Sequence, residues 1–207
     1  MKKFSALIRF PLALLTAASS FSTAAATLAL EDILQTVQRP AVLTADFVAE
    51  KRSPAIAITL KSQGRLVLSQ SKGLLWITTQ PFDDALGFSQ TKRGRLDDNG
   101  DWSVSENRST GRAMEMTQKI LTADPKSLSD HFFLSPSGTS SAWQLLASPK
   151  AGTAAQFLTE VLLAGSKHLQ HVQIVQTDGT ITRIDFSNIN PAPVLSKDDI
   201  LRLESLQ

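Results

Sequence analysis

The chain has 207 residues, no cysteine, and a formal net charge of +2 from 21 basic and 19 acidic side chains. Without cysteine it forms no disulfide, thiolate site or cysteine-linked lipid anchor, so in an oxidising compartment its stability must come from its core. Nucleic acid is an unfavourable partner, because phosphate contacts require a cluster of Lys and Arg and the sequence offers none.

The first 26 residues have the pattern of a cleaved secretory signal peptide, with three basic side chains among the first nine residues and three alanines at 24–26. The apolar run at 12–18 is shorter than the ~20 apolar residues of a membrane-spanning helix, which disfavours a membrane anchor. We therefore predict an exported, soluble chain that folds as one domain over residues 27–207. Without the signal, 18 basic and 19 acidic residues remain, and the formal charge is −1.

The exported chain begins with a predicted helix. Apolar residues from Leu30 to Val37 follow the i, i+3, i+4, i+7 spacing of a helix with one apolar face. Thr27 is a candidate N-cap, and Pro40 is expected to end the helix.

Four strands are predicted next, because apolar and polar residues alternate as they do in strands with one buried face. They are centred on 47–49, 56–60, 66–68 and 74–76. The clearest pair lies in residues 64–81, G-R-L-V-L-S-Q-S-K-G-L-L-W-I-T-T-Q-P, where a polar turn separates two apolar strands. This segment supplies large apolar side chains and no nucleophile with a base, no metal ligands and no phosphate loop, so it favours binding over catalysis.

The middle of the chain continues the strand pattern and then changes to a helical one. Strands are predicted at 86–91, around Leu96 and around Trp102, with a turn at 97–100 because Asn-Gly is a strong hairpin cue. Apolar residues at 111–121 recur with helical spacing.

The last third returns to strands. We predict them at 132–135, 143–147, 157–164, 169–177 and 180–186, the last two joined by a tight Asp178-Gly179 turn. Residues 188–196 are expected to form a surface loop, followed by a short tail at 200–206. The predicted class is α+β, with helices on one face of a long antiparallel sheet.

Six short pieces occur in an order that resembles the periplasmic outer-membrane lipoprotein carriers, the LolA-like family, and identify the chain as a divergent relative. No piece is decisive alone, and the order and spacing carry the resemblance. The pieces are D-F-V-A-E-K-R at 46–52, G-R-L at 64–66, G-L-L-W-I-T-T-Q-P at 73–81, L-S-D-H-F-F at 128–133, S-A-W-Q-L at 141–145 and D-G-T-I-T-R-I-D-F at 178–186.

The resemblance implies a curved antiparallel sheet that forms an incomplete, half-open β-barrel, with helices covering its concave face. It also implies a soluble periplasmic carrier that binds acyl chains in an apolar cavity and delivers them toward the outer membrane. The expected partners are a lipid or acylated lipoprotein as cargo, an inner-membrane loading complex and an outer-membrane acceptor. The protein is expected to be a monomer that uses no cofactor.

One position departs from the family pattern. Carriers of this family typically have Arg-Pro where this chain has Gln70-Ser71, and the arginine is implicated in holding the lid shut. Glutamine supplies neither a fixed charge nor a bidentate fork. The departure leaves a second function open, a non-enzymatic envelope interaction or assembly factor that uses the same fold without carrying lipid.

The candidate ligand-binding residues are large apolar side chains on the predicted strands and on the mid-chain helix, although such stripes also form ordinary cores. The candidates for the cavity wall are Phe47, Leu66, Leu68, Leu74, Trp76, Phe88, Phe132, Phe133 and Trp143, and those for the lid are Met114, Met116, Ile120 and Leu121.

Polar residues give only weak indications of a catalytic or metal site. We predict no catalytic residue, no metal site and no enzymatic activity. His168 and His171 are three positions apart on a strand and would face opposite sides, which makes a poor chelate. Ser137-Gly138 lacks the glycine pattern of a nucleophile elbow. A hydrolase acting on lipid or glycan remains a third hypothesis, which requires a Ser and a His within hydrogen-bond reach in a cleft.

Overall fold

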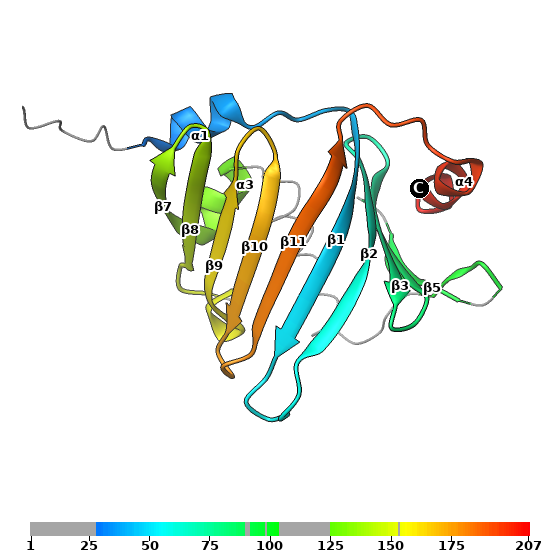
Figure 1. Cartoon of the computed structure of the whole chain (residues 1–207), viewed down its shortest axis with the longest axis horizontal. Coiled ribbons are helices and arrows are strands. Elements are labelled where there is room, and N and C mark those ends of the chain that lie inside the picture. Colours follow the sequence, from blue (N-terminus) through cyan, green and yellow to red (C-terminus); the bar gives the residue numbers. More distant parts are fainter. Residues whose placement is uncertain (1–27, 90–91, 98, 104–124, 153) are drawn as a thin grey trace, which may run out of the picture.

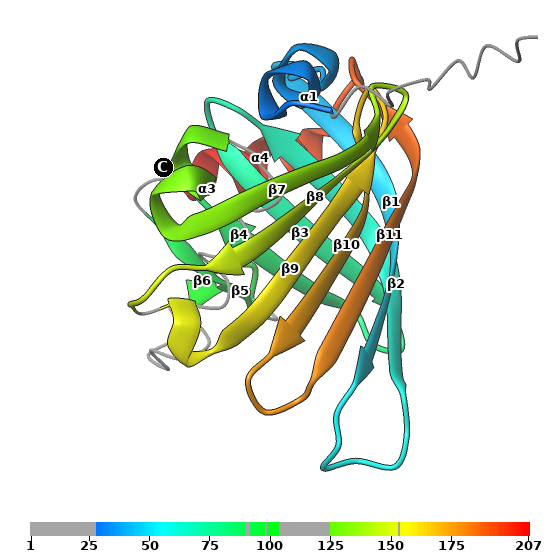
Figure 2. The same ribbon diagram turned by 90° about the vertical axis from the view of Figure 1, so that its left-hand side faces the viewer.

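The computed structural model of the protein describes residues 28–89, 92–97, 99–103, 125–152 and 154–207. These residues form one curved antiparallel sheet in the order β6-β5-β4-β3-β2-β1-β11-β10-β9-β8-β7 (Figures 1 and 2). The strands are β1 (Val42–Arg52), β2 (Leu60–Ser69), β3 (Gly73–Gln80), β4 (Asp84–Phe88), β5 (Arg93–Leu96), β6 (Trp102–Ser103), β7 (Phe132–Thr139), β8 (Ala142–Pro149), β9 (Leu158–Gly165), β10 (Leu169–Gln176) and β11 (Ile181–Asn190). The helices are α1 (Leu30–Thr36), α3 (Pro125–His131), α4 (Lys197–Ser205) and the 3-10 turn η1 (Ala154–Gln156).

The order of the strands shows that the sheet consists of two meanders joined at its centre. The chain runs outward from β1 to β6, and from β7 it runs inward to β11, which pairs with β1. In the described residues β6 and β7 are the two edges and do not pair with each other, so the sheet stays open. The predicted fold class, an incomplete barrel of α+β character, is confirmed.

Alternating side chains give the sheet two different apolar surfaces. Leu66 and Leu68 of β2 contact the main core on the concave face, which also receives Ile33 of α1 and Leu128 of α3. Val67, between the two leucines, faces the other way and packs with Leu75, Leu203 and Leu206, which we call the outer cluster. Helices α1 and α3 thus pack on the concave face beside β7, the face on which the resemblance implied that helices would lie.

The segment that contains Ile56 and Ile58 is not a strand, which corrects the prediction of four strands before residue 78. β2 runs without interruption from Leu60 to Ser69, and residues 53–59 form the loop that joins it to β1. Pro54 has no backbone N–H for a sheet ladder, and the amide of Ile56 instead donates to the carbonyl of Ser53 at 3.1 Å. The predicted strands at 56–60 and 66–68 therefore reduce to one.

The predicted C-terminal tail is a helix, α4, that lies on the outer face of β2 and β3 (Figure 1). The Ser196 hydroxyl caps it by accepting a hydrogen bond from the Asp199 amide at 3.1 Å, and Asp198 lies in its first turn. Carboxylates there interact favourably with the helix dipole. Ser196 is the N-cap signal for this helix in the sequence, but the two prolines that precede it favour a loop.

Candidate functional site

Three aromatic rings meet at the centre of the concave face. Phe47 of β1 stacks on Trp76 of β3 with ring centroids 3.9 Å apart, and Trp76 meets Phe186 of β11 edge-on at 6.2 Å. Phe47 and Phe186 are direct partners across the central β1–β11 pair. Gly64 lies opposite Phe47 on β2, the strand between β1 and β3, and has no side chain to hold the first two rings apart. The backbone register thus builds an aromatic centre from three strands.

Gly64 also bends the sheet at this point. The register between β2 and β3 shifts between Gln63 and Gly64, which is the signature of a β-bulge. A Cβ at position 64 would lie 1.9 Å from the carbonyl oxygen of Ile77, so only glycine permits this approach of the two backbones. The G-R-L piece of the sequence therefore contributes curvature as well as an apolar side chain.

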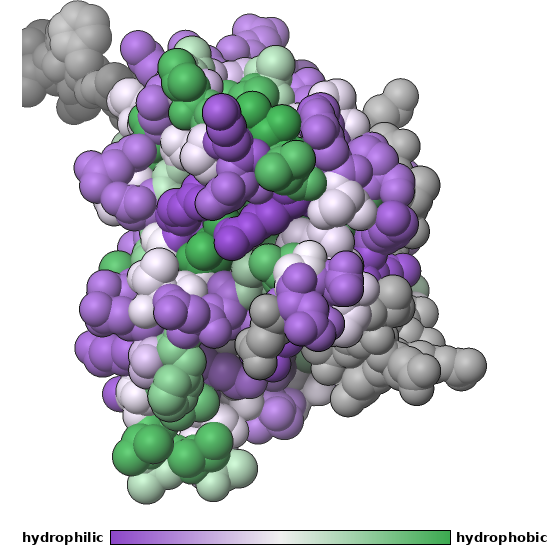
Figure 3. All heavy atoms as spheres, turned by 90° about the vertical axis from the view of Figure 1, so that its right-hand side faces the viewer, coloured by the Kyte–Doolittle hydropathy of each residue, from purple (hydrophilic) through white to green (hydrophobic). Residues whose placement is uncertain are grey.

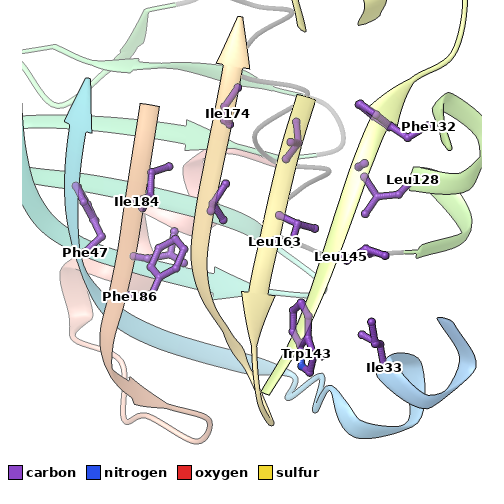
Figure 4. Packing of buried hydrophobic residues seen from close by; sticks show 14 of the residues in the cluster. Ile33, Phe47, Leu128, Phe132, Trp143, Leu145, Leu163, Ile174, Ile184 and Phe186 are labelled. Carbon is purple, nitrogen blue, oxygen red and sulfur yellow. The ribbon is translucent and has the colours of Figure 1, made fainter. Parts of the chain in front are cut away.

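Aliphatic and aromatic side chains extend the apolar surface to both sides of the aromatic centre, and Figure 4 shows the side that runs from Phe47 to Phe132. On the β2–β4 side, Leu74 and Phe88 are register partners and are 1% and 4% exposed. On the other side the surface continues through Ile184, Ile174, Val172, Leu163, Val161, Leu145, Trp143 and Phe132. The result is one continuous apolar face from β4 to β7.

The segment that follows helix α1 is attached to one end of this face by a backbone hydrogen bond. After the helix ends, the amide of Gln38 donates to the carbonyl of Lys167, in the β9–β10 turn, at 2.7 Å. The indole N–H of Trp143 donates to the carbonyl of Ser166 in the same turn at 2.6 Å. Ile33 is thereby held against the concave face, where it is 3% exposed.

Gln70, at the position where the family typically has arginine, fastens the connection between α1 and β1. Its side-chain amide donates to the carbonyls of Arg39 at 2.7 Å and Pro40 at 3.1 Å. Its backbone amide donates to the carbonyl of Ala41 at 3.0 Å. A neutral amide therefore holds the segment that follows the covering helix.

Replacing Gln70 with alanine should loosen this connection without unfolding the protein. Hydrogen exchange of the amides at 37–41 should become faster, while the free energy of unfolding should fall by about 1 kcal/mol or less, because the lost bonds are exposed to water. Gln63→Ala, at an exposed position near the other end of β2, is the matched control and should leave exchange at 37–41 unchanged. Equal exchange in the two variants would contradict the role of Gln70.

Most of the predicted wall residues that are described lie together on the concave face. Phe47, Leu66, Leu74, Phe88, Phe132 and Trp143 are buried in the main core, and Leu68 and Trp76 are partly buried against it. Phe133 corrects the prediction: it follows Phe132 on β7, so it faces the opposite side and is 65% exposed. The lid candidates Met114, Met116, Ile120 and Leu121, and the helix predicted for them, lie outside the described residues, as do the predicted signal segment and Thr27.

The candidate residues do not include the part of the apolar face that β9, β10 and β11 form. Strands β9, β10 and β11 contribute buried residues two positions apart, such as Val161 with Leu163 and Ile184 with Phe186. This alternation is visible in the sequence and identifies the strands, but only the strand order reveals that their inner faces adjoin that of β1.

The outer face carries a separate, polar pocket of about 370 Å³. It lies between β1, β11 and the loop before α4, and the ion pair of Arg65 and Asp199 lines it. Nearby, Asn188 adopts a left-handed conformation at φ 50° and donates to the Asp46 carboxylate at 2.7 Å. This pocket contains none of the predicted apolar site residues.

Within the described ranges, no three His, Cys, Asp or Glu side chains gather in a way that could hold a metal ion. His171 instead pairs with Asp185, with its Nδ1 2.6 Å from the carboxylate. None of the helices in the same ranges is long and apolar enough to cross a membrane.

Comparison with known proteins gives a family and distant structural similarities. The MucA/MucB complex of Pseudomonas aeruginosa is similar at 11% identity and a TM-score of 0.47, over 83% of this chain and 58% of that chain, so this chain spans less than two thirds of that relative. A LolA superfamily protein from Nitrosomonas europaea is similar at 10% identity and a TM-score of 0.40, over 82% of this chain and 96% of that chain. A search of curated proteins finds no match. The family model of the LolA-like outer membrane lipoprotein carrier proteins matches residues 22–188, and the chain belongs to this family.

Proposed function

We propose that the protein is a periplasmic carrier that holds acyl chains of a lipid or a lipid-modified protein on its concave face and delivers them toward the outer membrane. Family membership supports this role, and so does one structural observation in particular. That observation is the continuous apolar face from β4 to β7 in a sheet whose edges do not close on each other. A face of this kind matches an acyl chain in its apolar chemistry.

The energetics of such a face suit a carrier that must also release its cargo. Each buried CH₂ group contributes about 0.8 kcal/mol, so about ten buried methylene groups of one acyl chain are needed to reach micromolar binding. Binding of this kind is non-directional and depends on area, which allows different acyl chains to share one site. The role requires no bond to be made or broken, so we propose binding without catalysis and without a cofactor.

The first test asks whether the purified protein holds an acyl ligand. The protein is isolated from the periplasm without detergent and analysed by native mass spectrometry, followed by extraction of bound material and titration with a fluorescent fatty acid. The proposal expects a bound acylated molecule or saturable uptake of the probe. An empty protein that also fails to take up the probe would refute the proposal.

A pair of tryptophan variants locates the binding site. Trp76 belongs to the aromatic centre, whereas Trp102 lies on the outer face and donates its indole N–H to the Ser205 hydroxyl at 2.7 Å. Trp76→Ala should weaken probe binding about tenfold or more, because it removes a large contact area from the concave face. Trp102→Ala should leave binding within about twofold, and circular dichroism verifies that both variants are folded. Equal affinities of the two variants for the probe would mean that the ligand binds away from the concave face.

The alternative is an envelope interaction or assembly factor that keeps the fold without carrying lipid. One observation favours it: Gln70 holds the connection of α1 through neutral hydrogen bonds, where the family's typical arginine would supply a charge. The same titration separates the two functions, because only the carrier is expected to take up acyl chains in the absence of other proteins.

A further inference from the structure

Exposed apolar side chains gather at one end of the sheet. Because the strands are antiparallel, the β1–β2, β3–β4, β8–β9 and β10–β11 connections and the start of β7 all lie at this end. Among the residues that the structure describes, ten large hydrophobic side chains are exposed, and six of them are found there. These six are Ile56, Ile58, Leu60, Phe82, Phe133 and Phe157.

The β1–β2 loop, residues 53–59, extends beyond the other connections (Figures 1 and 2). Figure 3 shows the tip of the molecule at this end as a compact hydrophobic surface. Ile56 and Ile58 of the loop are 46% and 63% exposed. The loop therefore presents its apolar side chains away from the body of the protein and away from the concave face.

Basic residues lie on both sides of this apolar tip. Lys51 and Arg52 precede the loop, and Lys61 follows it. Lys61 forms an exposed ion pair with Glu50 at 2.6 Å, and Asp178 of the neighbouring turn adds one further acidic group. Together with Asp178, residues 50–61 place three basic and two acidic groups around the apolar centre, which leaves a net charge of +1. An apolar tip with a basic collar is the arrangement of segments that bind the interface of anionic membranes.

The backbone of the loop is also suited to an environment with little water, because some of its amides already have hydrogen-bond partners. The amide of Ile56 donates to the Ser53 carbonyl at 3.1 Å, and the amide of Ala55 donates to the Ser53 hydroxyl at 3.3 Å. Pro54 has no N–H to satisfy, and its ring lies against Gly179 of the β10–β11 turn, where a Cβ would be 3.0 Å from the proline Cγ. Two amides of the loop are therefore satisfied within it, and the loop is supported from one side, which lowers the cost of leaving water.

We propose that residues 53–59 insert into the headgroup region of an anionic phospholipid bilayer, with Lys51, Arg52 and Lys61 at the level of the phosphates. The inserted surface is distinct from the concave face, so docking on a membrane and holding an acyl chain are separate properties of the protein. Docking would place the carrier at the membrane where cargo is exchanged.

Site-specific fluorescence tests the insertion directly. The chain contains no cysteine, so Ile58→Cys provides a unique attachment point for an environment-sensitive dye. With vesicles of phosphatidylethanolamine and phosphatidylglycerol, the dye at position 58 should shift to the blue and be quenched by a quencher in the lipid phase. Val194→Cys is the matched control, because Val194 is 99% exposed and lies near the opposite end of β11, and its dye should not respond. No response at position 58, or equal responses at both positions, would overturn the proposal and favour a protein partner for the loop.

Vesicle flotation tests the two chemical components of the surface. Ile56→Ser/Ile58→Ser should reduce binding to these vesicles at least tenfold, whereas Val194→Ser should bind like the wild type. Lys51→Gln/Arg52→Gln should also reduce binding, and wild-type binding should weaken in high salt and on vesicles of phosphatidylcholine alone. Unchanged binding of the isoleucine variant would refute insertion of the loop.

Failure of this inference is distinguishable from failure of the proposed function. Uptake of a fluorescent fatty acid in solution reports the concave face, and Ile56→Ser/Ile58→Ser should leave it unchanged. Vesicle binding of the protein without acyl ligand reports the loop alone. A loop variant that lost both properties would show that the loop belongs to the acyl site, contrary to the inference.

Discussion

Replacing Phe47 with alanine is expected to lower the free energy of unfolding by about 3–5 kcal/mol, a large part of the stability of a domain of this size. Phe47 is 1% exposed, stacks on Trp76 with centroids 3.9 Å apart and is the register partner of Phe186. The variant removes the ring that joins β3 to the central strand pair and leaves a cavity between them. Urea unfolding followed by circular dichroism and tryptophan fluorescence measures the change.

Val48→Ala is the matched control for this prediction. Val48 is the next residue on β1, faces the other side of the sheet and is 46% exposed. Its truncation should cost about 1 kcal/mol or less, because little buried contact is lost. A cost for Phe47→Ala no larger than that for Val48→Ala would mean that the aromatic centre does not contribute to the stability of the sheet.

Removing Arg65 is expected to cost about 2–3 kcal/mol and to loosen α4. The guanidinium donates two hydrogen bonds to the Asp199 carboxylate, at 2.9 and 2.6 Å. The Asp199 side chain is only 5% exposed, whereas that of Arg65 is 38% exposed, so solvent screens part of the interaction. Arg65→Ala leaves a buried carboxylate without its main partner, and urea unfolding measures the cost.

Two further variants show whether the unpaired charge of Asp199 causes the loss of stability in Arg65→Ala. The double variant Arg65→Ala/Asp199→Ala should be no less stable than Arg65→Ala, because it removes the charge as well as its partner. The control Arg52→Ala, an exposed arginine at the end of β1, should cost much less. A double variant clearly less stable than the single one would show that packing of these side chains, not the buried charge, dominates.

The same pair predicts the direction of a pH dependence. Burial acts to raise the pKa of Asp199, but the hydrogen bonds from Arg65 and Ser196 and the charge of Arg65 outweigh it, so the pKa lies below its ordinary value. The stabilisation is therefore fully present above the unfolded-state pKa, about 3.9, and is lost as the pH falls through the lower pKa of the folded state. The difference in stability between wild type and Arg65→Ala should thus shrink below about pH 4. A difference that stays constant with pH would contradict this account.

The strands were largely predictable because alternation and turn residues are local signals. The pairs around the polar turn at 70–73 and around Asp178-Gly179 both form as expected. Ile56 and Ile58 alternate as residues of a strand do, but Pro54 beside them cannot donate a ladder hydrogen bond, and the predicted strand at this position does not form. Their exposure is consistent with a role at the surface instead of in the sheet.

The composition of the apolar face was predictable only in part, because it depends on contacts between distant segments. The sequence marked Phe47 and Trp76 as large apolar residues on strands, but their stacking depends on Gly64 between them and on the bulge beside it. Phe186 joins them because β11 returns to pair with β1, which no local pattern encodes. Phe133 was misplaced because two adjacent phenylalanines on a strand cannot both face inward.

The adjacency of β1 and β11 has a consequence for how the chain folds. Each meander can form from neighbouring segments, whereas the central pair joins residues such as Phe47 and Phe186 that are far apart in sequence. Closing so long a loop is entropically costly and slow, so the two halves are expected to form before the centre does. Until β11 is available, β1 has an unpaired edge beside a large apolar surface, the kind of intermediate that aggregates. The newly made chain is therefore most vulnerable before its last strand arrives.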